Sequence, residues 1–288
     1  MLTMLAASPA LWLISSGVLG LLVGSFLNVV ILRLPPRLFW RWRREGHAAL
    51  GMPPPADEPV PPDLIFSRSH CPHCHHPLAA WQNVPVLSFV LLRGRCRHCA
   101  APISLRYPLV ELASALLTVL VAWRFGPGLP AVAAMGFTWL MIALAGIDLE
   151  HQLLPDDLTL PGLWAGLLIA VGGLFTDPAS AILGAAAGYL LLWLIYQGFR
   201  LATGKEGLGY GDFKLLALLG AWCGWQGLPQ ILLLAAAVGS TLGVGLIASG
   251  RLQSGQPLPF GPFLAGAGWI VLLWGGTLHQ AYLDWSGL

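Results

Sequence analysis

Long apolar segments, separated by short stretches rich in charge, proline or glycine, dominate the pattern of this chain. A helix that crosses a lipid bilayer needs about 20 mostly apolar residues. Eight segments approach that length, at residues 11–32, 108–124, 129–147, 158–175, 179–199, 213–228, 229–249 and 259–283. The pattern therefore predicts an all-α polytopic membrane protein with about eight transmembrane helices.

One long polar segment interrupts this pattern and divides the chain into three predicted parts. Residues 1–34 contain the first transmembrane helix, residues 35–107 form a loop, and residues 108–288 form a seven-helix membrane core. The proline-rich stretch at residues 51–63 cannot build a hydrophobic core, so we expect an irregular segment there, of a role that the sequence leaves open.

Composition and charge agree with this class and orient the chain. Of 288 residues, 56% are hydrophobic and 10% are charged, against about 25% charged in soluble domains. Ten of the fifteen Lys and Arg lie between Arg33 and Arg106, which marks the loop as cytoplasmic and places the N-terminus outside. Residues 1–10 carry no basic region, so we expect a retained first helix and not a signal peptide. The partner that these charges indicate is membrane lipid and not nucleic acid, because no long basic stripe with interleaved aromatics is present.

Two aspartates stand at the ends of apolar segments that are otherwise nearly free of charge. Asp148 ends the third predicted span and Asp212 begins the sixth, so alternating spans bring both to the cytoplasmic side. An ionisable residue at membrane depth is costly and indicates a functional site. Gly209 and Gly211 beside Asp212 allow a backbone to approach the carboxylate closely. This arrangement predicts an aspartyl protease that works at a membrane surface.

Two CxxC pairs in the loop have the spacing of a metal site. Cys71 and Cys74 form one pair and Cys96 and Cys99 the other, with 21 residues between them. Such pairs complete a tetrahedral four-cysteine zinc site, which has no open coordination position and is structural. Disulfides are the alternative, but a cytoplasmic compartment keeps thiols reduced. Neighbouring histidines offer substitute ligands: His70, His73, His75, His76 and His98. Cys223 lies in a predicted span and fits a small buried hydrophobe.

Several other features have two interpretations each. GxxxG spacings allow close helix contact in lipid, although a chain with 35 glycines contains some by chance; they occur at Gly20 and Gly24, Gly162 and Gly166, Gly184 and Gly188, and Gly239 and Gly243. Glu111 either pairs with a nearby arginine or belongs to the active site. Lys214 is expected to extend toward the membrane surface. Asp156 and Asp157 are expected to be solvated loop carboxylates, unless Asp156 shapes the site.

An ordered set of motifs resembles the bacterial prepilin peptidases, the bifunctional leader peptidases and N-methyltransferases of type IV pilus and type II secretion systems. The stretch GLLVGSFLNVVILRLP at residues 20–35 is similar to the opening of that family. The cysteine pairs follow, then Arg106-Tyr107-Pro108 with Glu111, Ile147-Asp148, Leu154-Pro155-Asp156 with Leu158-Thr159, GYGD at 209–212, and PFGPF at 259–263. The set spans nearly the whole chain, and the proline-rich insert before Cys71 is its least typical part.

The resemblance implies a specific enzyme. Asp148 and Asp212 correspond to the catalytic aspartates, the four cysteines to a cytoplasmic zinc loop, and the substrates to type IV prepilins or pseudopilins with short basic leaders. The protein is then expected in the bacterial inner membrane, with its active site facing the cytoplasm. The resemblance also implies S-adenosylmethionine as methyl donor. No nucleotide-binding glycine motif is visible, so we place methyl transfer in the loop 35–107 only as a hypothesis.

Other classes of function were weighed against this interpretation. A proton- or ion-coupled transporter also uses membrane aspartates. Such a transporter is indicated by carboxylates at mid-bilayer in broken helices and by a repeat between the two halves of the chain. Asp148 and Asp212 instead stand at the ends of their predicted spans, and no such repeat is visible. A zinc metalloprotease needs a site with an open position, and no HExxH motif is present. A role as a purely structural assembly protein does not explain the paired aspartates. The peptidase interpretation is therefore preferred.

Overall fold

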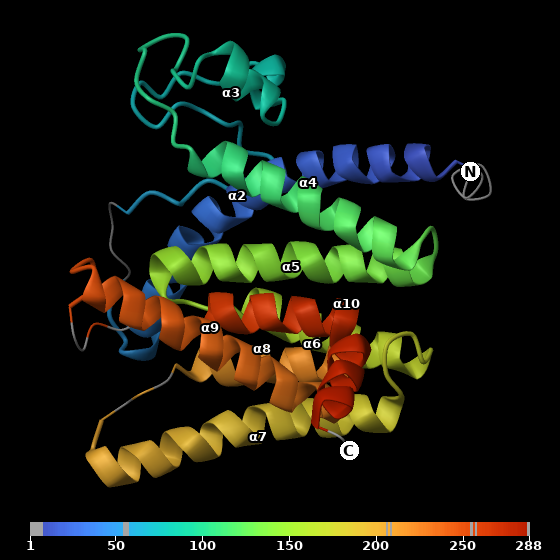
Figure 1. Ribbon diagram of the computed structural model, residues 1–288. Helices are drawn as coiled ribbons and strands as arrows, with labels where there is room; N and C mark the ends of the chain where they lie inside the picture. Colours follow the sequence, from blue (N-terminus) through green and yellow to red (C-terminus); the bar gives the residue numbers. More distant parts are fainter. Residues whose placement is uncertain are drawn as a thin grey trace. The chain divides into compact units, whose positions relative to one another are not determined.

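The computed structural model describes residues 8–53, 58–205, 207, 209–253, 256 and 258–286. This part of the chain is helical almost throughout and contains no strand, only two isolated β-bridges (Figure 1). The chain separates into two compact units, one that ends at Ala131 and one that begins at Val132. The all-α class predicted from the sequence is confirmed.

The described part of the first unit contains two long helices and, between them, a loop with two short helical elements. Its helices are α2 (Pro9–Ala49), η1 (Ala80–Asn83), α3 (Leu87–Leu91) and α4 (Arg106–Phe125). The second unit contains α5 (Leu129–His151) from its fourth residue onward, followed by α6 (Asp156–Val171), α7 (Pro178–Thr203), α8 (Tyr210–Cys223), η2 (Trp225–Gly227), α9 (Leu228–Ala248) and α10 (Gly261–Ser286).

Glycines allow α2 and α4 to pack with their backbones in contact. A Cβ atom on Gly20 would lie 2.7 Å from Cα of Ala115, and one on Gly24 would lie 2.8 Å from Cα of Glu111. Contacts this short leave no space for a side chain, so the first GxxxG spacing is a helix-packing motif of the kind found in lipid.

The helix α2 continues well beyond the apolar segment that predicted it. Pro35 and Pro36 lie inside the helix, which ends only at Ala49. Arg33 donates hydrogen bonds to the backbone oxygens of Asp63 and Ser67, at 2.7 and 2.9 Å, and Arg37 donates to that of Pro61 at 2.9 Å. The extension of α2 beyond its apolar segment is therefore bound by the loop that follows it. Residues 54–57 of the predicted proline-rich stretch lie outside the described residues.

The second unit is built around α8. Nearly every side chain from Asp212 to Trp222 is buried, because α6, α7 and α10 all pack against this short helix. A helix that is apolar on all sides is expected at the centre of a bundle. The central position of α8 means that its first turn, which carries Asp212, is placed by packing from several directions.

The remaining glycine pairs also lie at helix contacts, and two of them face α8. Gly184 and Gly188 of α7 meet its backbone, since Cβ atoms there would lie 2.3 and 2.6 Å from the oxygens of Gly220 and Leu216. Gly162 and Gly166 of α6 face the α8 side chains Leu218 and Trp222. Gly239 of α9 faces Phe263 of α10 at 3.2 Å, whereas Gly243 has only an ordinary contact.

All eight predicted spans are helical, but they differ in length. Six helices of the described chain are long and apolar enough to cross a membrane: α2, α4, α5, α7, the continuous segment Trp225–Ala248, and α10. The other two, α6 and α8, have 16 and 14 residues. The predicted number of about eight therefore holds for the helices, with two of them short.

Candidate active site and metal centre

Asp148 lies near the C-terminal end of α5 and is 5% exposed. One of its carboxylate oxygens, Oδ2, accepts a hydrogen bond of 3.0 Å from the backbone N–H of Gly261, the first residue of α10. A Cβ atom on Gly261 would lie 2.6 Å from that same oxygen. Only glycine therefore lets the start of α10 come close enough to orient Asp148, a contact between residues 113 positions apart.

Asp212 is the third residue of α8 and is 9% exposed. Its backbone N–H donates to the oxygen of Gly209 at 3.1 Å, which closes the first turn of the helix. A Cβ atom on Gly209 would lie 3.5 Å from Oδ2 of Asp212, which is an ordinary contact. Gly211 is more restricted, because a Cβ atom there would lie 2.9 Å from Cβ of Leu154.

Leu154 is the packing element that the two carboxyl sites share. It contacts Gly211, beside Asp212, and Gly261, whose hypothetical Cβ would lie 3.2 Å from Cδ2 of Leu154. These shared contacts with Leu154 place the two carboxyl groups within range of electrostatic interaction. Asp148 and Asp212, which the sequence pairs through the alternation of spans and through the family resemblance, therefore lie near each other, each at the end of a different helix.

An ion pair lies beside this carboxyl pair. Nζ of Lys214 lies 2.7 Å from both carboxylate oxygens of Asp156, the first residue of α6. Side chains of both residues are partly exposed, at 31% and 50%. Asp156 is thus paired and not simply solvated. The contact connects the N-terminal ends of α6 and α8 next to Asp212.

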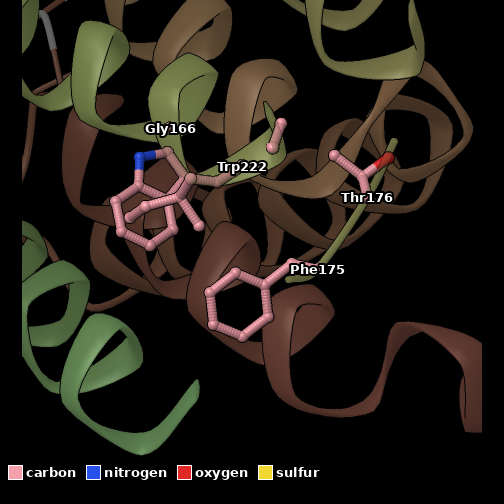
Figure 2. A pocket seen from close by; sticks show the side chains of 6 residues that line it. Gly166, Phe175, Thr176 and Trp222 are labelled. Atoms are coloured by element: carbon pink, nitrogen blue, oxygen red, sulfur yellow. The ribbon is translucent and has the colours of Figure 1, made fainter. Parts of the chain in front are cut away.

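A small pocket lies at the other end of α8 and does not belong to the carboxyl pair. Figure 2 shows Phe175, Thr176, Gly166 and Trp222 around it. Trp222 follows Asp212 by ten residues, which is about 15 Å along a helix. The indole N–H of Trp222 donates to the backbone oxygen of Gly162 at 2.9 Å, so its polar atom is already satisfied. The pocket has no ionisable lining residue.

The four loop cysteines form two similar knuckles in the first unit. In each, the first cysteine of the pair accepts a backbone hydrogen bond from the residue after the second: His75 N–H to Cys71 at 2.9 Å, and Ala100 N–H to Cys96 at 3.0 Å. His75 and Ala100 both have positive φ angles, 55° and 56°. The matching geometry indicates that both CxxC pairs fold as the same type of turn.

The four thiols lie close enough together to hold one metal ion. Their sulfur atoms all lie within 4.8 Å of one another, and the Sγ atoms of Cys71 and Cys99 are 3.8 Å apart. A tetrahedral site with metal–sulfur bonds of about 2.3 Å has sulfur atoms about 3.8 Å apart. Backbone hydrogen bonds from Cys99 and His98 lower the pKa of the Cys96 thiol to about 6, whereas the pKa of the neighbouring Cys99 thiol is raised to about 11, so the thiolate is favoured at Cys96. All five cysteines of the chain are free thiols.

Comparison with known proteins supplies the family. Models of two domains match: the Bacterial Peptidase A24 N-terminal domain over residues 18–125 and the Type IV leader peptidase family over residues 135–244. A prepilin leader peptidase/N-methyltransferase of Aeromonas hydrophila is 54% identical over 267 residues, which is 92% of this chain and 91% of the relative. This chain belongs to the type IV leader peptidase family. Proteins of the same name from Pseudomonas putida and Pseudomonas aeruginosa are 50% and 49% identical, over 99% and 100% of this chain and 98% and 99% of the relatives.

The family match agrees with the division seen in the structure. All four paired cysteines lie in the segment that matches the N-terminal domain, and both aspartates lie in the segment that matches the leader peptidase family. The resemblance seen in the sequence is confirmed at this level. None of the comparisons supports the transporter alternative, and no solved structure matches the chain.

Two contacts of the sites could not be found by reading the sequence. The PFGPF motif was noted at residues 259–263, but its glycine gave no sign of a hydrogen bond to Asp148. Leu154 stood in a matched motif without a role. The sequence also gives no sign that the carboxylate of Glu111 accepts a hydrogen bond of 2.8 Å from the backbone N–H of Val86.

Proposed function

We propose that this protein removes the leader peptide from prepilins by means of Asp148 and Asp212 and then methylates the new N-terminus. The observation that carries the proposal is a pair of buried carboxyl groups on two helices, close enough to interact, in a chain of the leader peptidase family. The relatives are named for both activities, prepilin leader peptidase and N-methyltransferase.

The two carboxyl groups supply acid and base catalysis without a covalent intermediate. Two carboxylates brought together cannot both ionise cheaply, so the pair holds one proton. The ionised member takes a proton from water, while the protonated member donates to the scissile carbonyl oxygen. The Gly261 N–H orients Asp148 through Oδ2. The closely packed glycines around Leu154 hold both carboxyl groups with little freedom to move.

The expected substrates are type IV prepilins or pseudopilins, and the expected place of cleavage is the cytoplasmic face of the inner membrane. The basic loop supports this orientation through the positive-inside rule, with the N-terminus in the periplasm. A leader with basic residues stays in the cytoplasm while the apolar helix of the substrate stays in lipid. The junction between the two then reaches the carboxyl pair at the membrane surface.

The four-cysteine cluster is proposed to hold one structural zinc ion. Cys71, Cys74, Cys96 and Cys99 would be its ligands, and a closed four-thiolate site supplies folding energy and no catalytic water. Methyl transfer is proposed for the loop 35–107, with S-adenosylmethionine as donor. The described chain has no strand and so lacks a glycine-rich strand-to-helix turn for a nucleotide. The proposal assigns no residue to the donor.

The test of the peptidase is cleavage of a prepilin by aspartate variants. Asp148→Asn and Asp212→Asn should each abolish loss of the leader, measured by mass spectrometry in detergent. Asp177→Asn is the matched control, because Asp177 caps α7 by accepting the Ser180 N–H at 2.9 Å, and asparagine caps a helix equally well. Full cleavage by either dyad variant would show that a different carboxylate is catalytic.

The test of the second activity supplies the substrate already cleaved. Asp148→Asn should still transfer labelled methyl groups from S-adenosylmethionine to a mature pilin, because methyl transfer to an amine does not need two acids. If a correctly folded Asp148→Asn variant loses methyl transfer, the two sites overlap and the placement in the loop is wrong.

A further inference from the structure

Glu111 is the buried ionisable residue that the proposed chemistry leaves unused. It is 7% exposed and lies in the apolar helix α4. An acidic side chain in such a position is energetically costly and indicates a functional role. Gly24 of α2 packs directly on its Cα, and Ser25 of α2 lies near its carboxyl group. Glu111 is therefore held at the α2–α4 contact, and its remaining partner is Val86 of the loop.

The turn at Val86 is strained. Its φ and ψ angles are 58° and −48°, and the N–H of Leu87 donates to the oxygen of Pro85. These are the features of a γ-turn with positive φ, a rare conformation that is especially unfavourable for a β-branched residue. Such strain persists only where surrounding contacts impose it. The 2.8 Å hydrogen bond from Val86 N–H to Glu111 Oε2 is a contact of this kind.

The strained turn is continuous with the second metal knuckle. Helix α3 follows it directly, and Phe89 of α3 lies against Gly94, where a Cβ atom would be 3.1 Å from its ring. Gly94 accepts the backbone hydrogen bond of Ile103 at 2.8 Å, and these two residues enclose the Cys96–Cys99 knuckle. The segment is thus fixed at its far end by covalent continuity with α4 and at its near end by Glu111.

We infer that Glu111 is a positioning residue that holds the Pro85–Leu87 turn against α4, so that the second knuckle keeps the geometry needed for metal binding and for methyl transfer. The part concerning methyl transfer rests on the proposed function, which places that activity in the loop. Glu111 acts only through the backbone of Val86, as a hydrogen-bond acceptor. Its charge is not required by this role, and its removal should leave the aspartate pair unaffected.

The first experiment measures the rate at which purified, zinc-loaded protein releases zinc to a chelator. Glu111→Ala should release zinc about tenfold faster. A tenfold change corresponds to the lower end of the free energy that a hydrogen bond to a charged group contributes. Glu111→Gln keeps an acceptor oxygen and should stay near the wild-type rate. Glu45→Ala, which removes an exposed carboxylate from α2 of the same unit, is the control and should have no effect.

A rescue variant distinguishes positioning from general damage to the fold. Glycine adopts positive φ without strain, so Val86→Gly in the Glu111→Ala background should restore most of the slow zinc release. Unchanged release in Glu111→Ala would overturn the inference. So would a Glu111→Gln variant as fast as Glu111→Ala with no rescue by Val86→Gly, because the carboxylate would then have a role of its own.

The second experiment measures methyl transfer to a mature pilin and cleavage of a prepilin by the same variants. Glu111→Ala should lower methyl transfer about tenfold and leave cleavage within twofold of wild type, with Val86→Gly again restoring the loss. Equal loss of both activities would overturn the assignment to methyl transfer. Failure of the proposed peptidase would be visible separately, as full cleavage by the aspartate variants.

Discussion

The substitution Gly261→Ala tests the positioning of Asp148 without changing a catalytic group. The new Cβ would lie 2.6 Å from Oδ2 and 3.1 Å from Cγ of Asp148, whereas ordinary contact begins at 3.4 Å. The carboxylate must therefore move by about 0.8 Å, and a misplacement of about 1 Å costs about a hundredfold in rate. We expect cleavage to fall by about two orders of magnitude, equivalent to about 2.7 kcal/mol of activation free energy.

The stability of the Gly261→Ala variant should change little, because a short side chain can move aside. The measurements are the rate of prepilin cleavage, followed by mass spectrometry, and the Tm in detergent. Gly266→Ala on the same helix meets no atom within 4 Å and should keep wild-type activity. Gly268→Ala would come within 2.4 Å of Leu219 Cδ2, so it should lower the Tm while folded protein stays active. Wild-type cleavage by Gly261→Ala would refute the role given to the Gly261 contact.

Three further predictions concern the metal, the helix packing and the ion pair. Purified protein should contain about one zinc per chain by elemental analysis, and Cys74→Ser should lose it while Cys223→Ser keeps it. Gly220→Ala would place Cβ 2.1 Å from a backbone oxygen of α7, so the yield of folded protein should fall sharply, whereas Gly198→Ala, with no atom within 4 Å, should express normally. Lys214→Ala should lower stability by less than about 1 kcal/mol in thermal unfolding, as expected for an exposed pair; complete loss of cleavage would instead give Lys214 a part in the chemistry.

The sequence predicted the features that depend on composition along one segment. The eight apolar stretches are all helical in the structure. Asp148 and Asp212 are identified as unusual residues because a carboxylate in an apolar segment is energetically costly and indicates a functional site. The CxxC spacing predicted the cysteine cluster for a similar reason, since each pair is a local turn that brings two sulfur atoms together. These features can be predicted from the sequence because each depends on residues that lie close together along the chain.

Features that depend on contacts across the chain were not accessible in this way. The apolar pattern ends the first predicted span at residue 32 and begins the loop at residue 35, yet α2 continues through Pro35 and Pro36 to Ala49, while Arg33 and Arg37 bind the returning loop. The role of Gly261 arises from a partner 113 residues away. A motif can indicate that a glycine is important at such a position, but only the fold shows which atom a side chain introduced there would displace.

The position of α8 connects the packing of the second unit to its proposed chemistry. This helix has only 14 residues and is too short to cross a bilayer unaided, so its location is set by the helices around it. Gly184 and Gly188 bring α7 onto its backbone at Gly220 and Leu216, and these contacts lie about two turns and one turn, respectively, beyond Asp212. Because a helix is rigid over that length, fixing its middle and far end also fixes the carboxylate at its start. Substitutions at the glycine contacts far from Asp212 are therefore expected to lower the amount of folded protein, whereas those beside the carboxyl pair change the rate of cleavage directly.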